Sequence, residues 1–178
     1  MPSAGDVPVI DALDRYRGLR GCGLNPRDRL RWGTPVPEAG AGVYVVSLAE
    51  DAGTNEGALS KAAIRRAAVD ELLTVRPELL LRWRLPDAEG ARDPAQRVLA
   101  CIGGPAYIGL ADQPLRTRVR HYYRTPLGAK RPNAGGWWLK TLSLLGELWV
   151  HWAPASNYED AERTMLRPFE AAPELHAV

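Results

Sequence analysis

The sequence predicts a small α/β (α+β) domain with three short strands flanked by helices. Two observations lead to this fold class. β-Branched and aromatic residues recur in three short runs, and segments with apolar residues at helical spacing separate those runs. At 178 residues the chain has about the length of one domain, so a single domain spanning 1–178 is expected.

The three predicted strands are short runs of β-branched and aromatic residues. They are 42–48, which is entered through glycines, 106–110, and the alternating run 147–152. The beginning of the chain is rich in Gly, Pro and Arg. We therefore expect an irregular N-terminal arm over 1–40, with one short helix near 10–17.

Helices are predicted where apolar residues recur every three or four positions. The clearest segments are 58–76, 115–124 and the segment that starts after Asn157. Asn157 is a suitable N-cap, and Asp160 three residues later gives a weaker form of the capping box. Pro168 must kink or end this last helix.

Two further segments have a helical pattern. Residues 50–104 separate the first two strands and are expected to form a helical insertion, with a short helix near 94–102. The apolar segment 137–145 also has helical spacing. Its Trp137 and Trp138 leave two interpretations open, base stacking and core packing.

Charge is unevenly distributed along a chain whose net charge is only +2. The stretch 113–146 contains seven Lys and Arg residues and no Asp or Glu. A basic block of this kind indicates a polyanionic partner, nucleic acid first, with a solvated charged face as the alternative. Six of these residues are candidate nucleic-acid contacts: Arg116, Arg120, Arg124, Lys130, Arg131 and Lys140.

Composition argues against several other classes of protein. No apolar run approaches the roughly 20 residues that a membrane helix needs, so no membrane partner is expected. The N-terminus lacks a basic start followed by an apolar core, so we expect no signal peptide and a cytoplasmic protein.

Cys22 and Cys101 have no metal-ligand spacing. Two free thiols are expected in that compartment, with a disulfide as the alternative.

Two tripeptides and three polar residues stand out in chain order. The first strand opens with Gly-Val-Tyr at 42–44, and the second contains Tyr-Ile-Gly at 107–109. Arg118 and Tyr122 follow one turn apart in the next helix, and Glu162 lies in the last helix. Taken singly, each of these features has an ordinary structural explanation, whereas all of them in this order are far more specific.

The helix geometry predicts that Arg118 points inward. Leu115, Arg118, Val119 and Tyr122 share one helix face at i, i+3, i+4 and i+7. The apolar residues on that face indicate that it packs on the sheet. Arg118 should therefore lie beside the strands that bear the two tripeptides.

The order of these elements resembles the GIY-YIG nuclease family, which includes the catalytic domain of the UvrC excision-repair nuclease and certain homing and restriction endonucleases. The matching positions are 42–44 and 107–109 for the two tripeptides, Arg118 for the helix arginine, Tyr122 for the second tyrosine of the UvrC-like branch and Glu162 for the metal-binding glutamate. The resemblance covers 42–48 and 105–170. It implies a small three-stranded antiparallel sheet flanked by helices.

The chain departs from the family in three places. The connection between the tripeptides, 50–104, is much longer than the usual hairpin. Leu110 stands where some members carry a lysine, and the family's asparagine beyond the glutamate has no counterpart. These departures keep open an alternative from another class, a non-catalytic nucleic-acid-binding or protein-interaction module with the same fold.

The resemblance implies a metal-dependent endonuclease that hydrolyses DNA phosphodiester bonds. Glu162 would hold one divalent ion, Mg²⁺ or Mn²⁺, since these ions prefer oxygen ligands. Arg118 would bind phosphate oxygens through its charged fork. Tyr107 would be the general base, and Tyr44 and Tyr122 would orient the water, the base and the phosphate. A monomer and a homodimer both remain open.

Overall fold

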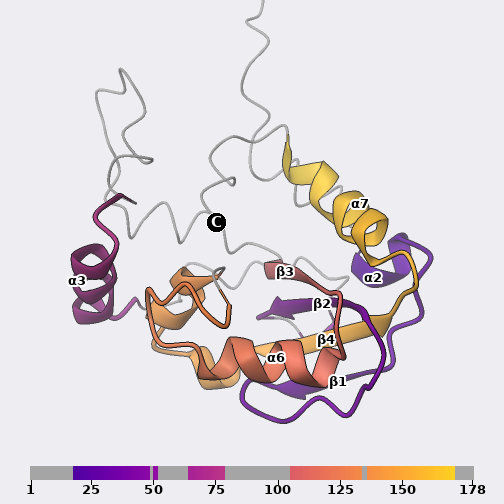
Figure 1. Cartoon of the computed structure of the whole chain (residues 1–178), viewed down its shortest axis with the longest axis horizontal. Coiled ribbons are helices and arrows are strands. Elements are labelled where there is room, and N and C mark those ends of the chain that lie inside the picture. The colour runs from indigo at the N-terminus through magenta and orange to yellow at the C-terminus, as the bar shows by residue number, and fades with distance from the viewer. Residues whose placement is uncertain (1–17, 49, 52–63, 79–104, 134–135, 171–178) are drawn as a thin grey trace, which may run out of the picture.

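The computed structural model describes most of the chain between residues 18 and 170 (Figure 1). The described ranges are 18–48, 50–51, 64–78, 105–133 and 136–170. Several predicted features therefore lie outside the described residues. They are the short helices near 10–17 and 94–102, most of the insertion, and Cys101.

A four-stranded antiparallel sheet forms the centre of the fold. In spatial order the strands are β1 (Asp28–Arg31), β4 (Trp149–Pro154), β2 (Gly42–Ser47) and β3 (Pro105–Ala111). β1 and β3 are therefore the two edge strands of this sheet. The mixed α/β class and the antiparallel sheet agree with expectation, but the predicted number of three strands is wrong.

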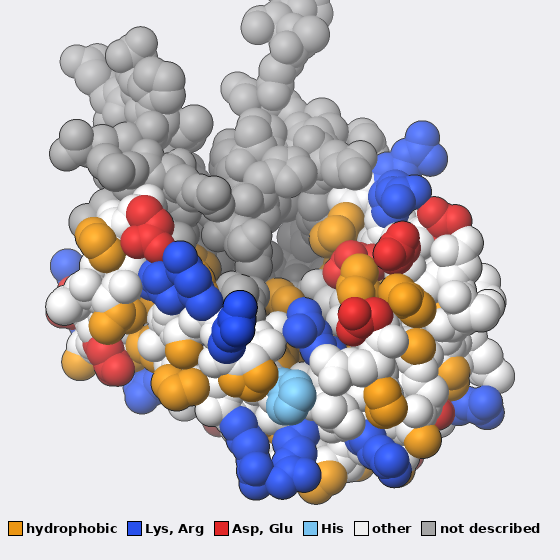
Figure 2. All heavy atoms as spheres, in the orientation of Figure 1, with side chains coloured by type: hydrophobic (Ala, Val, Ile, Leu, Met, Phe, Trp, Pro, Cys, Tyr) orange, Lys and Arg blue, Asp and Glu red, His pale blue; other side chains and the backbone are white. Residues whose placement is uncertain are grey.

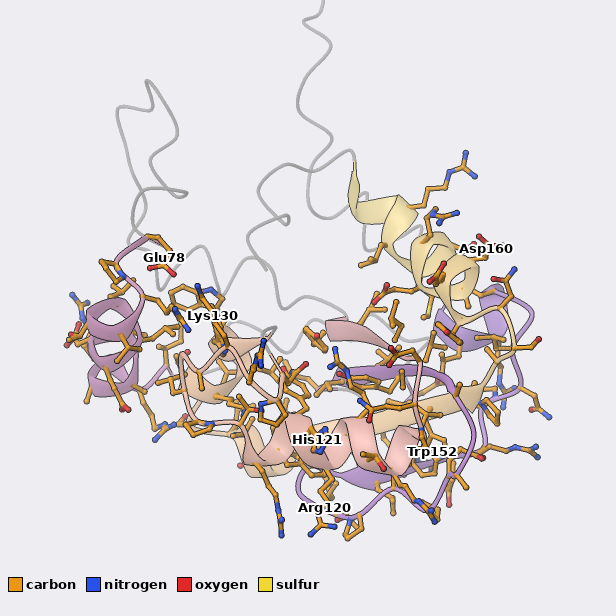
Figure 3. All side chains as sticks on the ribbon, viewed as in Figure 1. Glu78, Arg120, His121, Lys130, Trp152 and Asp160 are labelled. Carbon is orange, nitrogen blue, oxygen red and sulfur yellow. The ribbon has the colours of Figure 1, made fainter. Side chains whose placement is uncertain are left out.

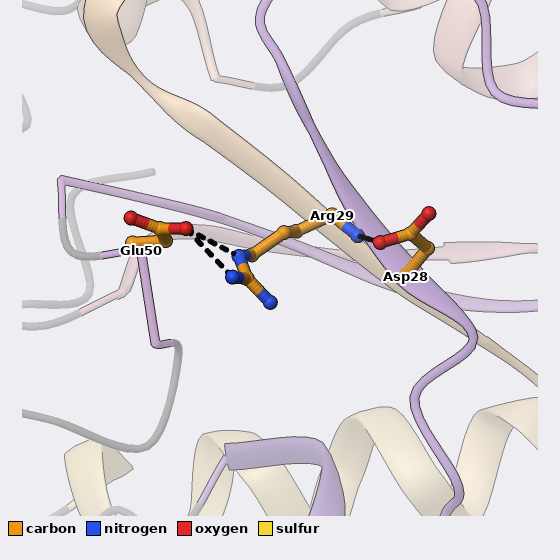
Figure 4. A network of polar contacts seen from close by, with 3 residues as sticks. All are labelled: Asp28, Arg29 and Glu50. Atoms are coloured by element: carbon orange, nitrogen blue, oxygen red, sulfur yellow. Dashed lines mark hydrogen bonds and ion pairs between the residues drawn. The ribbon is translucent and has the colours of Figure 1, made fainter.

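The extra strand, β1, lies inside the segment that was expected to be an irregular arm. It is short, and charge dominates its sequence, Asp-Arg-Leu-Arg, so no apolar alternation marked it. Arg29 Nε and Nη2 donate to Glu50 Oε1 at 3.0 and 2.6 Å, and Asp28 Oδ1 accepts from the Arg29 amide at 2.8 Å (Figure 4). Charged side chains on an edge strand discourage pairing with another chain.

The other strands differ from expectation only at their ends. β2 is buried along its whole length, as its apolar sequence predicts. β4 begins at Trp149 because residues 145–147 form a short 3-10 helix, η3 (Leu145–Glu147). A second 3-10 helix, η2 (Trp137–Thr141), replaces the first part of the helix suggested by the apolar segment 137–145.

The helices are α2 (Gly18–Gly21), α3 (Arg66–Val75), α6 (Leu115–Arg124) and α7 (Tyr158–Glu170). α6 has the predicted bounds. Among the described residues α3 begins later than predicted, since Ile64 instead forms a β-bridge with Leu142. α7 continues through Pro168, where a kink or an end was expected.

Alternation along the strands divides the core into two clusters, one on each face of the sheet. On one face Tyr44 and Val46 pack with Leu115, Val119 and Tyr122 of α6. On the other face Val43 and Val45 pack with Leu19 of α2 and with Ala161 and Met165 of α7. Helices α6 and α7 therefore cover opposite faces of the sheet (Figure 1).

None of the described helices combines the length and the apolar character needed to cross a membrane. Cys22, beside α2, is a half-buried free thiol whose pKa is raised by burial.

Candidate active site

The candidate site is built on the edge strand β3. Tyr107 and Gly109 lie on the face that α6 covers, whereas Ile108 and Leu110 pack in the α7 layer. Gly109 pairs with Tyr44 of β2, so the two tripeptides meet in register. A Cβ atom at Gly109 would lie 2.6 Å from Tyr44 Cζ and 2.8 Å from Tyr107 Cε1. Only glycine leaves room for the two rings.

Three tyrosine rings form one cluster beneath this edge. The ring centroids of Tyr44 and Tyr107 are 5.9 Å apart, those of Tyr107 and Tyr122 are 4.9 Å apart, and those of Tyr44 and Tyr122 are 6.2 Å apart. Tyr122 Oη donates to the Gly136 carbonyl at 2.9 Å. Burial raises the pKa of all three phenols, so the cluster is neutral around pH 7.

Arg118 and Glu162 reach the cluster from opposite sides of the sheet. Arg118 is half-buried on the inward face of α6, as the helix geometry predicts, and Glu162 is half-buried on α7. Burial raises the pKa of the Glu162 carboxyl, while a hydrogen bond from the Leu110 backbone amide and the positive charge of Arg118 act against this rise. Arg118 likewise opposes the effect of burial on the pKa values of Tyr44 and Tyr107. The charge of Glu162 adds to the raised pKa of Tyr107.

The structure thus brings the five predicted residues together across one sheet edge, although they come from two strands and two helices. The open edge makes this arrangement feasible. A side chain from the α7 layer can reach the α6 layer only by passing around an edge strand, and no described residue pairs with the outer side of β3.

Two polar atoms of this cluster are buried, Tyr44 Oη and Arg118 Nε. The Tyr44 hydroxyl interacts with its neighbours Tyr107 and Arg118, whereas Arg118 Nε has no hydrogen-bond partner among the described residues. A buried donor without a partner costs free energy on the order of 1–3 kcal/mol. Such atoms are expected where a water or a ligand oxygen completes the site.

Glu162 is the carboxylate that could hold a divalent ion at this edge. The described residues contain no group of three or more His, Cys, Asp or Glu that could hold a metal, so a closed protein cage is not present there. Mg²⁺ and Mn²⁺ do not need one, because they commonly bind one or two carboxylates and keep several waters. A half-buried carboxylate with a raised pKa, beside phenolic oxygens, fits such an ion, whose charge would offset the cost of ionising Glu162.

The basic residues of the predicted nucleic-acid surface fall into two places. Arg116, Arg120 and Arg124 are exposed along α6, and Lys130 and Arg131 are exposed in the loop that follows it. Figure 2 shows Lys and Arg side chains gathered over α6 and this loop, and Figure 3 locates Arg120 and Lys130 within them. These five exposed side chains can meet a polyanion.

Lys140 is not part of that surface. Its side chain is only 8% exposed, and its Nζ donates to the carbonyl oxygens of Tyr122, at 2.6 Å, and Thr125. These carbonyls lie at the C-terminal end of α6, where a cation interacts favourably with the helix dipole. Burial lowers the pKa of Lys140 to about 8. The predicted role in binding nucleic acid is therefore replaced by a structural one.

Asn133 belongs to the site and was missed by the sequence reasoning. Its side chain is 1% exposed and forms a hydrogen bond with Tyr107. It lies in the segment 125–136, whose basic and turn-forming residues marked it only as a loop. No spacing in the sequence connects Asn133 with a tyrosine more than 20 positions earlier.

Packing decides between the two interpretations that were left open for the tryptophans. Trp138 is buried, and Trp137 Nε1 donates to the Ala129 carbonyl at 3.0 Å with the Arg76 guanidinium 5.1 Å above its ring. Core packing is thus the correct interpretation for both tryptophans. His151 is also a core residue, because it is buried and its Nε2 lies 2.9 Å from Ser47 Oγ.

Comparison of the chain with family models, with characterised proteins and with solved structures gave no match. Function must therefore be inferred from the residues that meet at the β3 edge.

Proposed function

We propose that this chain is a metal-dependent endonuclease of the GIY-YIG type that hydrolyses DNA phosphodiester bonds. One observation carries the proposal. Arg118 and Glu162, from helices on opposite faces of the sheet, meet three tyrosines at the edge strand, and the buried Arg118 Nε has no partner among the described residues. A site that places a fixed cation with an unpartnered donor beside a carboxylate and phenols suits a phosphate group with its attacking water.

Arg118 would bind the non-bridging oxygens of the phosphate. Its guanidinium is always charged and planar, and Nε is a buried donor with no partner among the described residues. Charge that develops on the phosphorus oxygens would be stabilised by this donor without reorganisation of the site. The buried Tyr44 hydroxyl, which interacts with Arg118 and Tyr107, would help to orient these two groups.

Glu162 would hold the divalent ion. When bound, Mg²⁺ or Mn²⁺ supplies Lewis-acid stabilisation of the phosphate and of the leaving oxygen. The Leu110 amide fixes the Glu162 carboxylate at the sheet edge, on the side of the site opposite to α6.

Tyr107 would accept the proton of the attacking water. Burial raises its pKa, while the hydrogen bond from Tyr44, the charge of Arg118 and the hydrogen bond from Asn133 oppose this rise. The phenol is therefore protonated in the free protein at neutral pH, and the base role requires added positive charge at the site. Tyr122, held by the Gly136 carbonyl, would keep the ring of Tyr107 in place.

The exposed arginines of α6, together with Lys130 and Arg131, would bind the DNA backbone. The alternative is a binding module that keeps the fold without turnover. It is favoured by the neutral state of the tyrosine cluster and by Leu110 at the position where some family members carry lysine.

A plasmid-nicking assay with Mg²⁺ or Mn²⁺ tests the proposal. Glu162→Gln should fold, bind DNA and fail to cleave, because a carboxamide has no charge to hold the cation. Arg118→Ala should also fail to cleave, but calorimetry should detect Mn²⁺ binding by this variant and none by Glu162→Gln. Glu159→Gln, an exposed acid on the same helix, is the matched control and should cleave.

Two outcomes would count against the nuclease. Full cleavage by Glu162→Gln would remove the central residue of the proposed site. If the wild-type protein neither cleaves nor binds Mn²⁺ in the presence of DNA, the binding module becomes the better explanation.

A further inference from the structure

The segment between α6 and η2 holds a buried polar side chain against the tyrosine cluster. Asn133 is 1% exposed although basic residues surround it in the sequence. A buried amide is costly unless its hydrogen bonds are satisfied. Its position directly after the exposed residues 130–132 therefore calls for an explanation in terms of its partners.

Asn133 is held in place from the end of α6. Its backbone amide donates to Thr125 Oγ1 at 3.2 Å, and that hydroxyl donates to the His121 carbonyl at 2.7 Å. Between these two residues, the Gly128 carbonyl accepts a hydrogen bond of 2.5 Å from Nε of Arg76, which follows α3. The loop is thus fixed to the ends of α6 and α3, and these contacts define the position of Asn133.

The same loop touches the tyrosine cluster a second time. The Gly136 carbonyl accepts the Tyr122 hydroxyl at 2.9 Å, and a Cβ atom at Gly136 would lie 3.0 Å from Tyr107 Cδ2. Asn133 and Gly136 therefore approach neighbouring tyrosines from one segment. This second contact does not involve the Asn133 amide, and it limits the space around the ring of Tyr107.

The hydrogen bond between Asn133 and Tyr107 has a direction. This hydrogen bond lowers the pKa of Tyr107, which means that it stabilises the phenolate. Only a donor stabilises a phenolate, so the amide Nδ2 of Asn133 donates to the phenolic oxygen. This hydrogen bond directs one lone pair of Tyr107 Oη toward the loop, and the Tyr44 hydroxyl donates to the same oxygen. The hydroxyl hydrogen of Tyr107 is then left to face the side on which Arg118 and Glu162 lie.

We propose that Asn133 is a positioning residue, which holds the hydroxyl of Tyr107 in the orientation that faces Arg118 and Glu162. This inference rests on the proposed nuclease function for its effect on cleavage, but the contact itself can be measured in the absence of cleavage. Asn133 touches neither substrate nor metal in this proposal and acts only through Tyr107.

The test uses the full chain with two substitutions at Asn133. Asn133→Asp keeps the shape of the side chain and replaces the donating amide with an acceptor, and Asn133→Ala removes the side chain. Thr125→Ser is the conservative control, because it keeps the hydroxyl that holds the Asn133 backbone. Tyrosine labelled with ¹³C at Cζ reports on each phenol, and Tyr107→Phe identifies the signal of Tyr107.

The Tyr107 signal should move in both Asn133 variants and stay in place in Thr125→Ser. The signal of Tyr158, on α7, should not move. Cleavage by the Asn133 variants should fall about 10- to 100-fold in kcat, the range typical of residues that orient a catalytic group. DNA affinity should be unchanged, since the exposed arginines and Lys130 are untouched.

An unmoved Tyr107 signal in both Asn133 variants would overturn the inference, as would a moved signal accompanied by wild-type kcat. If the wild-type protein does not cleave DNA, the proposed function fails, and the NMR result alone decides whether Asn133 holds Tyr107. A moved signal would then support the positioning role in a protein whose activity lies elsewhere.

Discussion

Lys140 makes the stability of this protein depend on pH in an unusual direction. The pKa of its ammonium falls from 10.5 to about 8 on folding because the side chain is buried. Between these two values the unfolded chain binds one more proton than the folded chain. The free energy of unfolding must therefore rise as the pH increases through this window. The linkage relation gives a gain of about 2 kcal/mol between pH 7 and pH 9.5.

The tyrosine cluster limits this gain at higher pH. Burial raises the pKa values of Tyr44, Tyr107 and Tyr122 above the usual 10. Above pH 10 the unfolded chain loses phenolic protons that the folded chain keeps, so the free energy of unfolding falls again. The raised pKa of Cys22 acts in the same direction from about pH 9, so stability should reach its maximum below the usual phenol pKa of about 10.

Urea denaturation followed by tryptophan fluorescence at pH 7, 8, 9 and 9.5 measures the effect. Lys140→Met keeps most of the apolar stem and removes the titrating group, so its free energy of unfolding should not show the rise. The comparison uses the change with pH rather than the absolute stability, because the variant also lacks two hydrogen bonds to the end of α6. A flat or falling profile for the wild type, or an equal rise in Lys140→Met, would refute the reasoning.

Two further predictions concern the surface and the sheet edge. The double variant Lys130→Ala/Arg131→Ala should bind DNA less tightly, and the plot of log K against log salt, measured by fluorescence anisotropy, should become shallower by about 0.9 for each phosphate that the variant no longer neutralises; an unchanged slope would exclude this loop from the DNA-binding surface. Gly109→Ala should lower both cleavage and stability, the latter by about 1–3 kcal/mol, because its Cβ collides with the rings of Tyr44 and Tyr107. Gly146→Ala, where a Cβ atom meets nothing within 4 Å, is its control.

Local sequence signals predicted an element correctly where its apolar pattern and a helix-breaking residue gave the same boundaries. α6 has the predicted bounds because its apolar face meets the sheet and Pro126 excludes a longer helix. β2 was found because most of its residues are β-branched or aromatic, and β3 because it is an apolar run that contains Tyr107 and Ile108. The inward position of Arg118 followed from its spacing relative to Leu115 and Val119, both of which are fully buried.

Features decided by tertiary contacts could not be found in this way. β1 is a strand only because β4 pairs with it, and its own residues are mostly charged. Lys140 belongs to a basic run in the sequence, yet the end of α6 approaches it and removes it from solvent. Asn133 depends in the same way on a loop conformation that no periodicity reports.

The strand order has a consequence for the way the chain assembles during synthesis. β2 and β3 can pair as soon as both have left the ribosome, but β4, which separates β1 from β2, is made last of the four. Until then β1 has no partner among the described strands, and one side of β2 is open. Until β4 is synthesised, the nascent protein therefore exposes the edge of β2 that β4 later covers. An exposed apolar strand edge can pair with other chains and favours aggregation. Completion of the sheet is a single late event, the insertion of residues 149–154 into its centre.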